Sequence, residues 1–258
     1  MIGAGVLAVV AGVVGVLGVS GRLPLRPLLT FLQFKLDPAK TRIEQLVRLQ
    51  HPQTGVEVFL VGTTHHYHYD DNGWTVWNLK AVVERVQPDT MLIEMMADAV
   101  VDGRVGEGPV EMPFLATLGA ERGVHVVGID SGWDGGWQGR QQRMFEQVQT
   151  ALSTTTASTG TTPKRVLLAS GMMHLQPFVE QLSGAGFVVQ PWSDDERKAV
   201  SDDAGIAQVW PKGLAPALRA AIARAKSGTL DTDPQRAADM GWFIQIREQI
   251  LDKMGEPH

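Results

Sequence analysis

Cysteine is absent from this chain of 258 residues. The absence excludes disulfide bonds and thiolate ligands, so any metal site must be built from histidine and carboxylate side chains. An excess of positive charge is lacking as well, because the formal net charge is −5 at pH 7. An acidic main domain does not suit a nucleic-acid partner, and we therefore expect no nucleic acid to bind it.

Charge is also missing from residues 1–19, an apolar run that is just long enough to cross a bilayer as a helix. The next residues, 20–50, hold six Arg or Lys residues against two acids, and basic residues after an apolar segment favour the cytosolic side. We predict a single-pass transmembrane anchor at 1–19, a basic juxtamembrane linker with a short helix at 20–50, and a main domain at 51–258 on the cytosolic side. A cleaved signal peptide and a Gly/Val-rich helix buried in the fold are the alternatives.

Apolar runs alternate with helical patterns through the main domain. Runs rich in β-branched residues predict five strands, at 56–62, 90–95, 124–130, 165–171 and 187–192. Apolar residues at helical spacing predict the intervening and C-terminal helices, at 76–86, 113–123, 139–152, 176–186, 213–226 and from about 233. Thr75 is the expected N-cap of the first of these helices, and Pro88 its stop. This alternation predicts an α/β fold in which helices flank a mostly parallel β-sheet, preceded by the N-terminal hydrophobic helix.

Four successive predicted strands end in side chains that bind metals or move protons, namely His65, Glu94, Asp130 and His174. Ligands of open α/β sheets bind beyond the carboxyl ends of the strands, so we expect these side chains to meet at one edge. Two imidazoles and a carboxylate suit a divalent metal ion that activates water. Gly62 and Gly171 would let the backbone turn tightly and approach a ligand. His66 and His68, which would share a face in an extended segment, would form a second layer of side chains around the metal ion or the substrate, or else would be solvated loop residues.

The chain resembles the TraB/Tiki superfamily, which also includes GumN-like and ChaN-like proteins. The family's first block is an apolar strand running into G-T-x-H, and "LVGTTH" matches it. The second is a strand that follows "PD" and ends in Glu, as in "QPDTMLIEM"; the third is a strand ending in G-x-x-H before a helix, as in "VLLASGMMHLQPFVEQL". The resemblance covers about 56–190, and the order and spacing of the blocks are more specific than any single block.

The resemblance implies a divalent-metal-dependent hydrolase that acts on peptides or proteins. It implies that His65 and His174 bind a metal ion of the Mn, Co or Zn class and that Glu94 is a ligand or the general base. Asp130 would orient a histidine or complete the coordination. The binding residues expected around them are Gly62, Thr64, His66 and Gly171.

One position departs from the family pattern. The family often has an arginine directly after the strand-end Asp and another downstream, whereas "GIDSGWDGGWQGR" has Ser131 after Asp130 and an arginine at Arg140. Arg140 is therefore the residue expected to stabilise the transition state, with a structural Asp–Arg pair as the alternative.

Two rival functions follow from the same residues. ChaN-like relatives bind haem, for which Met and His are both axial ligands, and Met172 and Met173 precede His174. Other relatives act in membrane signalling or organisation without catalysis. A metal-free esterase, in which a histidine beside Glu94 acts as general base, is the further rival.

Overall fold

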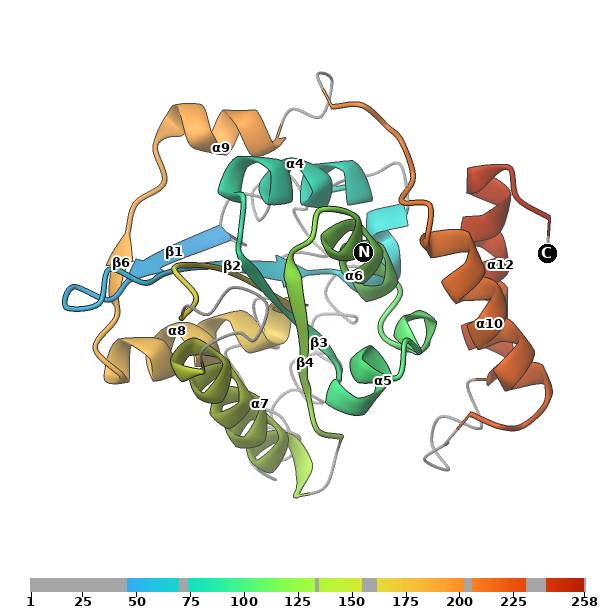
Figure 1. Ribbon diagram of the computed structural model, residues 1–258, viewed down its shortest axis with the longest axis horizontal. Helices are drawn as coiled ribbons and strands as arrows, with labels where there is room; N and C mark the ends of the chain where they lie inside the picture. The colour runs from blue at the N-terminus through green and yellow to red at the C-terminus, as the bar shows by residue number, and fades with distance from the viewer. Residues whose placement is uncertain are drawn as a thin grey trace, which may run out of the picture.

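The structure is a computed structural model that describes residues 46–69, 74–132, 135–154, 162–201, 206–230 and 240–257. At its centre is a six-stranded sheet with helices on both faces (Figure 1). The hydrophobic helix expected at 1–19 and most of the linker expected at 20–50 lie outside the described residues. Within the described ranges, the search for a helix long and apolar enough to cross a membrane finds none.

The sheet combines parallel and antiparallel strands. Its strands are β1 (Leu46–Gln50), β2 (Glu57–Thr63), β3 (Thr90–Met96), β4 (His125–Asp130), β5 (Arg165–Gly171) and β6 (Val188–Gln190). They lie in the order β4-β3-β5-β2-β1-β6. The pairs β2–β5, β5–β3 and β3–β4 are parallel, whereas β1 is antiparallel to both β2 and β6. The α/β class is thus confirmed, with a mixed sheet in which four adjacent strands run in the same direction.

Strand β1 corrects one prediction. A short helix was expected at the end of the 20–50 linker, and for residues 46–50 that prediction is wrong because they form a strand. Leu46 and Leu49 are buried in the cores on opposite faces of the sheet. A five-residue segment cannot show whether its apolar residues follow the period of a strand or of a helix, and here pairing with β2 decides the outcome.

Helices cover the two faces of the sheet (Figure 1). One face carries α4 (Val76–Val86), α6 (Glu111–Glu121) and α9 (Asp194–Ser201), with α10 (Leu214–Lys226) beside α6 and α12 (Met240–Met254) packed on α10. The other face carries α7 (Gly136–Ser153) and α8 (Leu175–Gly184). Side chains of successive strand residues point to opposite faces, so β2 serves both cores. Phe59 and Val61 face the α4 side, and Val58 and Leu60 face the α7 side.

Helix α4 begins and ends where its sequence predicts. The Thr75 hydroxyl accepts a hydrogen bond from the Trp77 amide at 3.2 Å, and the Asn78 side chain accepts one from the Thr75 amide at 2.8 Å. These bonds satisfy amide groups that a helix N-terminus leaves free. After Val86 the chain leaves the helix at Gln87, which has a φ of 47° and precedes Pro88.

The end of β3 closes tightly on β4. A Cβ atom at Gly128 would lie 2.6 Å from the Met95 carbonyl oxygen, so only glycine allows this approach. The β3–β4 register shifts between Ile93 and Met96, and an irregularity of this kind re-aims side chains. Glu94 lies inside this irregular stretch, and short helix α5 (Ala97–Val101) follows directly.

Candidate active site

The carboxyl ends of the four parallel strands bring the predicted site residues to one edge. Glu94 lies near the end of β3 and Asp130 is the last residue of β4. His65 opens the 3-10 helix η1 (His65–Tyr69) after β2, and His174 ends the 3-10 helix η3 (Met172–His174) after β5. Arg140 comes from the first turns of α7, which begins three residues earlier than predicted.

Arg140 is the centre of this cluster. Its Nη2 donates to Glu94 Oε1 at 2.7 Å and to Asp130 Oδ2 at 2.8 Å, and its Nε donates to Asp130 Oδ1 at 2.9 Å. Its Nη1 lies 3.2 Å from His174 Nε2. Arg140, Glu94, Asp130 and His174 are each no more than 6% exposed. Buried charges need such partners, so the guanidinium and the two carboxylates stabilise one another.

The Glu94 carboxylate is ionised in this setting. Burial alone raises the pKa of Glu94, but Coulombic interactions with His174, Arg140 and His65, and a hydrogen bond from the Gly171 amide, lower it to about 2. The amide bond, to Oε2, is 2.5 Å long. Burial lowers the pKa of Arg140, but Asp130 and Glu94 outweigh this and raise it above its ordinary value. Both groups therefore carry full charge at neutral pH.

His174 is held in one tautomer. Gln141 donates its amide N–H to Gln181 Oε1 at 2.8 Å, which leaves Gln141 Oε1 to accept from His174 Nδ1 at 2.6 Å. His174 Nε2 then carries the lone pair that faces Arg140. The Trp137 ring stacks on the imidazole, with ring centroids 4.4 Å apart. Burial lowers the pKa of His174 further than nearby Glu94 raises it, so the ring is neutral at neutral pH.

His65 lies on the more open side of the cluster, with 45% of its side chain exposed. Its Nδ1 is 3.0 Å from Oε1 of Glu111, a residue of α6 that is fully buried. Desolvation lowers the pKa of His65, but the Glu111 carboxylate outweighs it and raises that pKa to about 9. A Cβ atom at Gly171 would lie 3.1 Å from His65 Nε2 and 3.3 Å from Glu94 Oε2. Glycine at this position therefore lets the imidazole and the carboxylate approach the strand end together.

The other predicted binding residues have separate environments. The Thr64 amide donates to His68 Nε2 at 2.9 Å, and His68 Nδ1 donates to the Trp74 carbonyl at 2.7 Å. These two hydrogen bonds let His68 brace the loop after β2. His68 is buried, and desolvation is the main cause of its lowered pKa. Gly62 is approached by the Met172 backbone, since a Cβ atom there would lie 3.2 Å from Met172 Cα. The side chain of His66 lies outside the described residues.

Three residues of this site were not among the predicted ones. Glu111 lies 46 residues after His65, and no local pattern marks it as the partner of that histidine. Gln141 follows Arg140 directly, and Trp137 precedes it by one helical turn. In a helix, Trp137 lies one turn from both Arg140 and Gln141, but the predicted helix began at residue 139 and left Trp137 outside it.

Comparisons with known proteins identify no relative, so function must be inferred from the fold and the geometry of the site. No protein-family model matches this sequence, and neither a curated protein nor a solved structure matches it significantly. In the part of the chain that the structure describes, no three His, Asp or Glu side chains already have the spacing of a metal site. What the residues define is a buried charged centre at the carboxyl edge of a parallel α/β sheet.

Proposed function

We propose that this chain is a hydrolase of the TraB/Tiki type that cleaves peptides at the carboxyl edge of the sheet. One observation carries the proposal. Two imidazoles are each fixed through Nδ1 by a side-chain oxygen, that of Glu111 for His65 and that of Gln141 for His174. Both rings present Nε2 beside the ionised carboxylate of Glu94. Metal-binding histidines are typically held in this way.

The donor set suits a divalent cation of the Mn, Co or Zn class. We assign it to His65, His174 and Glu94; His174 Nε2 would exchange its contact with Arg140 for the cation, and His65 would release its proton. Both oxygens of Asp130 already bind Arg140, and Oδ1 also accepts the Ser131 and Gly132 amides. We therefore place Asp130 in the role of positioning Arg140, in place of the ligand role expected from the sequence.

When bound, such a cation supplies Lewis-acid polarisation and lowers the pKa of water. That help matters because a carboxylate with a pKa of about 2 is by itself a weak base. In hydrolysis the water oxygen bonds to the peptide carbonyl carbon and Glu94 takes the water proton. The peptide C–N bond then breaks as Glu94 passes that proton to the departing amine. Arg140 would stabilise the negative charge that develops on the carbonyl oxygen.

A second candidate is a metal-free hydrolase, and the position of Arg140 favours it. Arg140 already supplies a buried positive charge among Glu94, Asp130 and His174. Neutral His174, with its Nε2 lone pair, would act as general base, and protonated His65 as general acid. Haem ligation, the non-enzymatic alternative, ranks below both hydrolases, because two fixed imidazoles beside an ionised carboxylate are a donor set for a divalent cation.

The finer features of the fold belong to the same proposal. We propose that residues 1–19 form a single-pass membrane anchor and that the described domain lies on the cytosolic side, reached through the basic linker. The support is the uncharged run and the basic residues after it. Peptides or proteins in the cytosol would then be the substrates.

The test is a peptide-library cleavage assay on the purified full chain, with and without a chelator, beside metal analysis. Glu94→Gln keeps the side-chain shape and removes the charge, and we expect a loss in turnover of about 10²–10⁴-fold. Glu84→Gln, on the exposed side of α4, is the matched control and should leave turnover unchanged. Cleavage that depends on Glu94 but survives chelation would select the metal-free candidate. Unchanged cleavage in Glu94→Gln would refute both.

A further inference from the structure

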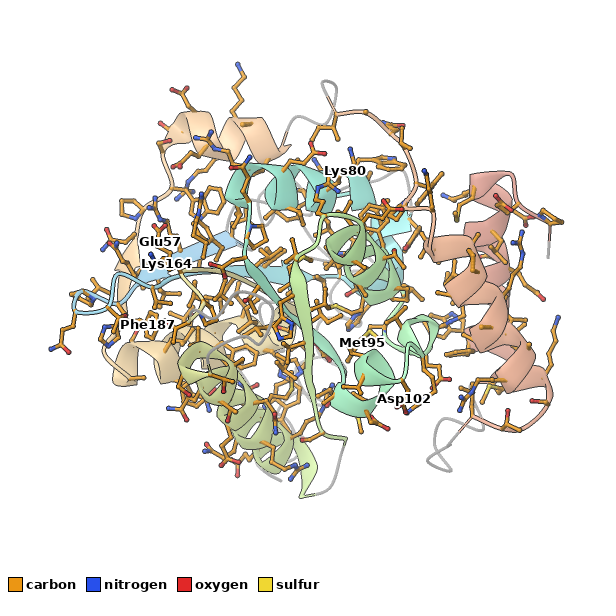
Figure 2. All side chains as sticks on the ribbon, viewed as in Figure 1. Glu57, Lys80, Met95, Asp102, Lys164 and Phe187 are labelled. Atoms are coloured by element: carbon orange, nitrogen blue, oxygen red, sulfur yellow. The ribbon has the colours of Figure 1, made fainter. Side chains whose placement is uncertain are left out.

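A second group of charged residues surrounds a cavity at the opposite edge of the sheet. The cavity has a volume of about 290 Å³ and is lined mainly by Arg48, Arg85, Arg165, Phe59, Trp192 and Glu196. Arg48 comes from β1, Arg85 from the last turn of α4 and Arg165 from the start of β5. Figure 2 labels Glu57 and Lys164 at this end of the sheet and Met95, the neighbour of Glu94, toward the other.

The guanidinium groups of this cavity are only partly neutralised. Arg48 Nε donates to Glu57 Oε1 at 3.0 Å. Arg165 Nε lies 3.9 Å from Glu57 Oε2, and Arg85 Nη2 lies 3.6 Å from Glu196 Oε1. Among the described residues, the side chains of Arg85 and Arg165 have these ion pairs but no hydrogen-bond acceptor. Three positive charges thus face two carboxylates.

Two of the arginines lie against the ring of Phe59. The guanidinium carbons of Arg48 and Arg165 lie 5.5 Å and 5.6 Å from the centroid of the Phe59 ring. The Trp192 ring meets Phe59 edge-on, with centroids 5.7 Å apart. The indole N–H of Trp192 is buried without an acceptor in the described part of the chain. A buried donor without a partner is costly, so an acceptor from a ligand would offset that cost.

We propose that this cavity binds the phosphate group of a small phosphomonoester. Three guanidinium groups from three different elements match the three terminal oxygens of a phosphomonoester, whereas a carboxylate offers two oxygens in one plane. The volume lies at the small end of ligand pockets, which suits a phosphate with a short organic group. Arg165 and Gly171 are the first and last residues of β5, six steps apart and thus roughly 20 Å at the rise of a strand. The proposal is therefore independent of the hydrolase site.

The experiment is a calorimetric titration of the full chain in detergent with inorganic phosphate, at constant ionic strength set by sodium chloride. We expect saturable binding in the wild type and a loss of at least tenfold in affinity in the double variant Arg85→Gln/Arg165→Gln. Arg122→Gln, an arginine outside the cavity that pairs with Glu84, is the matched control and should bind as the wild type does. Circular dichroism checks that each variant is folded.

Further titrations separate the sources of the phosphate and challenge the proposal. Short-chain phosphatidic acid binding at least tenfold more tightly than inorganic phosphate would assign the site to a lipid headgroup, and equal or weaker binding to a free phosphate. Succinate binding as tightly as phosphate would overturn the choice of phosphate. No saturable binding by the wild type to either phosphate probe, or equal binding in the double variant, would overturn the site.

Discussion

At the residue scale, one guanidinium holds together acceptors from three strand ends. Arg140 neutralises Glu94 and Asp130 and faces the lone pair of His174. Its partners are buried, so their charges have little compensation from water. Around this centre, Glu111 and Gln141 set the protonation and orientation of the two histidines. The charge states of Glu94, Arg140 and the two histidines thus depend on their neighbours.

Replacing Arg140 by methionine should destabilise the fold by about 3–5 kcal/mol at pH 7, because two carboxylates would remain buried without their cation. The loss should shrink at pH 5, since an unpaired buried carboxylate has a raised pKa and takes up a proton. Urea unfolding at both pH values measures this. Arg143→Gln, which removes donors to Ser131 and to the Gly132 carbonyl, is the control and should cost much less. A loss of under 1 kcal/mol for Arg140→Met would contradict the assigned role.

The His65–Glu111 pair should make stability depend on pH. Because folding raises the pKa of His65 from 6.5 to about 9, its contribution is fully present below pH 6.5 and is lost as pH rises through about 9. The imidazole is nearly half exposed, so the contribution should be about 1 kcal/mol or less. His65→Asn, which tolerates the φ of 55° at this position, should differ from the wild type at pH 6 but not at pH 10.

Unfolding free energies of both proteins, measured by urea titration across that range, test the expected pH dependence. Glu111→Gln serves as the second arm, because without the carboxylate the pKa of His65 should fall and the pH-dependent difference should vanish. A difference between wild type and His65→Asn that stays constant from pH 6 to pH 10 would argue against the ion pair.

At the element scale, helix α12 braces the segment that leads into α6 and Glu111. Arg247 is 1% exposed and donates to the carbonyls of Gly106 at 2.9 Å, Gly108 at 2.7 Å and Phe243 at 3.1 Å. The same helix supplies Lys253, which donates to the Tyr69 carbonyl at the end of η1. The C-terminal helix therefore contacts both segments that position His65, although it lies outside the parallel sheet.

Arg247→Met should cost about 3 kcal/mol, since the buried Gly106 carbonyl and the partly buried Gly108 carbonyl would lose their donors. It should also raise the rate of amide hydrogen exchange in residues 105–115. Exchange measured by mass spectrometry, together with urea unfolding, tests both effects. The control is Arg219→Gln on α10, whose more exposed side chain binds Glu256 and the Pro257 carbonyl and should change stability by about 1 kcal/mol at most. Unchanged exchange in 105–115 would show that α12 does not stabilise this segment.

At the scale of the whole molecule, the sheet separates the two proposed sites. The carboxyl edge of the four parallel strands carries the charged centre, and the opposite edge carries the arginine cavity. Strands β1 and β6 extend the sheet beyond β2, and β1 supplies Arg48 to the cavity. The segment that precedes β1 connects the domain to the proposed membrane anchor.

Deleting residues 1–19 should release the protein from the membrane. The full chain should stay in the membrane fraction after carbonate extraction, because an uncharged helix of this length is stable in a bilayer. The deletion variant should appear in the supernatant, and its circular dichroism spectrum should show that the α/β domain is still folded. Immunoblotting of both fractions is the measurement. Extraction of the full chain by carbonate would refute the anchor.

The sequence by itself determined the α/β class, most strand and helix positions and the four polar strand ends, because these depend on local periodicity, capping and turn residues. Tertiary structure decided the rest. β1 became a strand through its pairing with β2, and Glu111 became the partner of His65 only when α6 packed against η1. Arg140, expected near the start of a helix, binds residues at three of the strand ends. Such contacts join residues far apart in the chain, so they depend on the packing of whole elements and leave no local pattern.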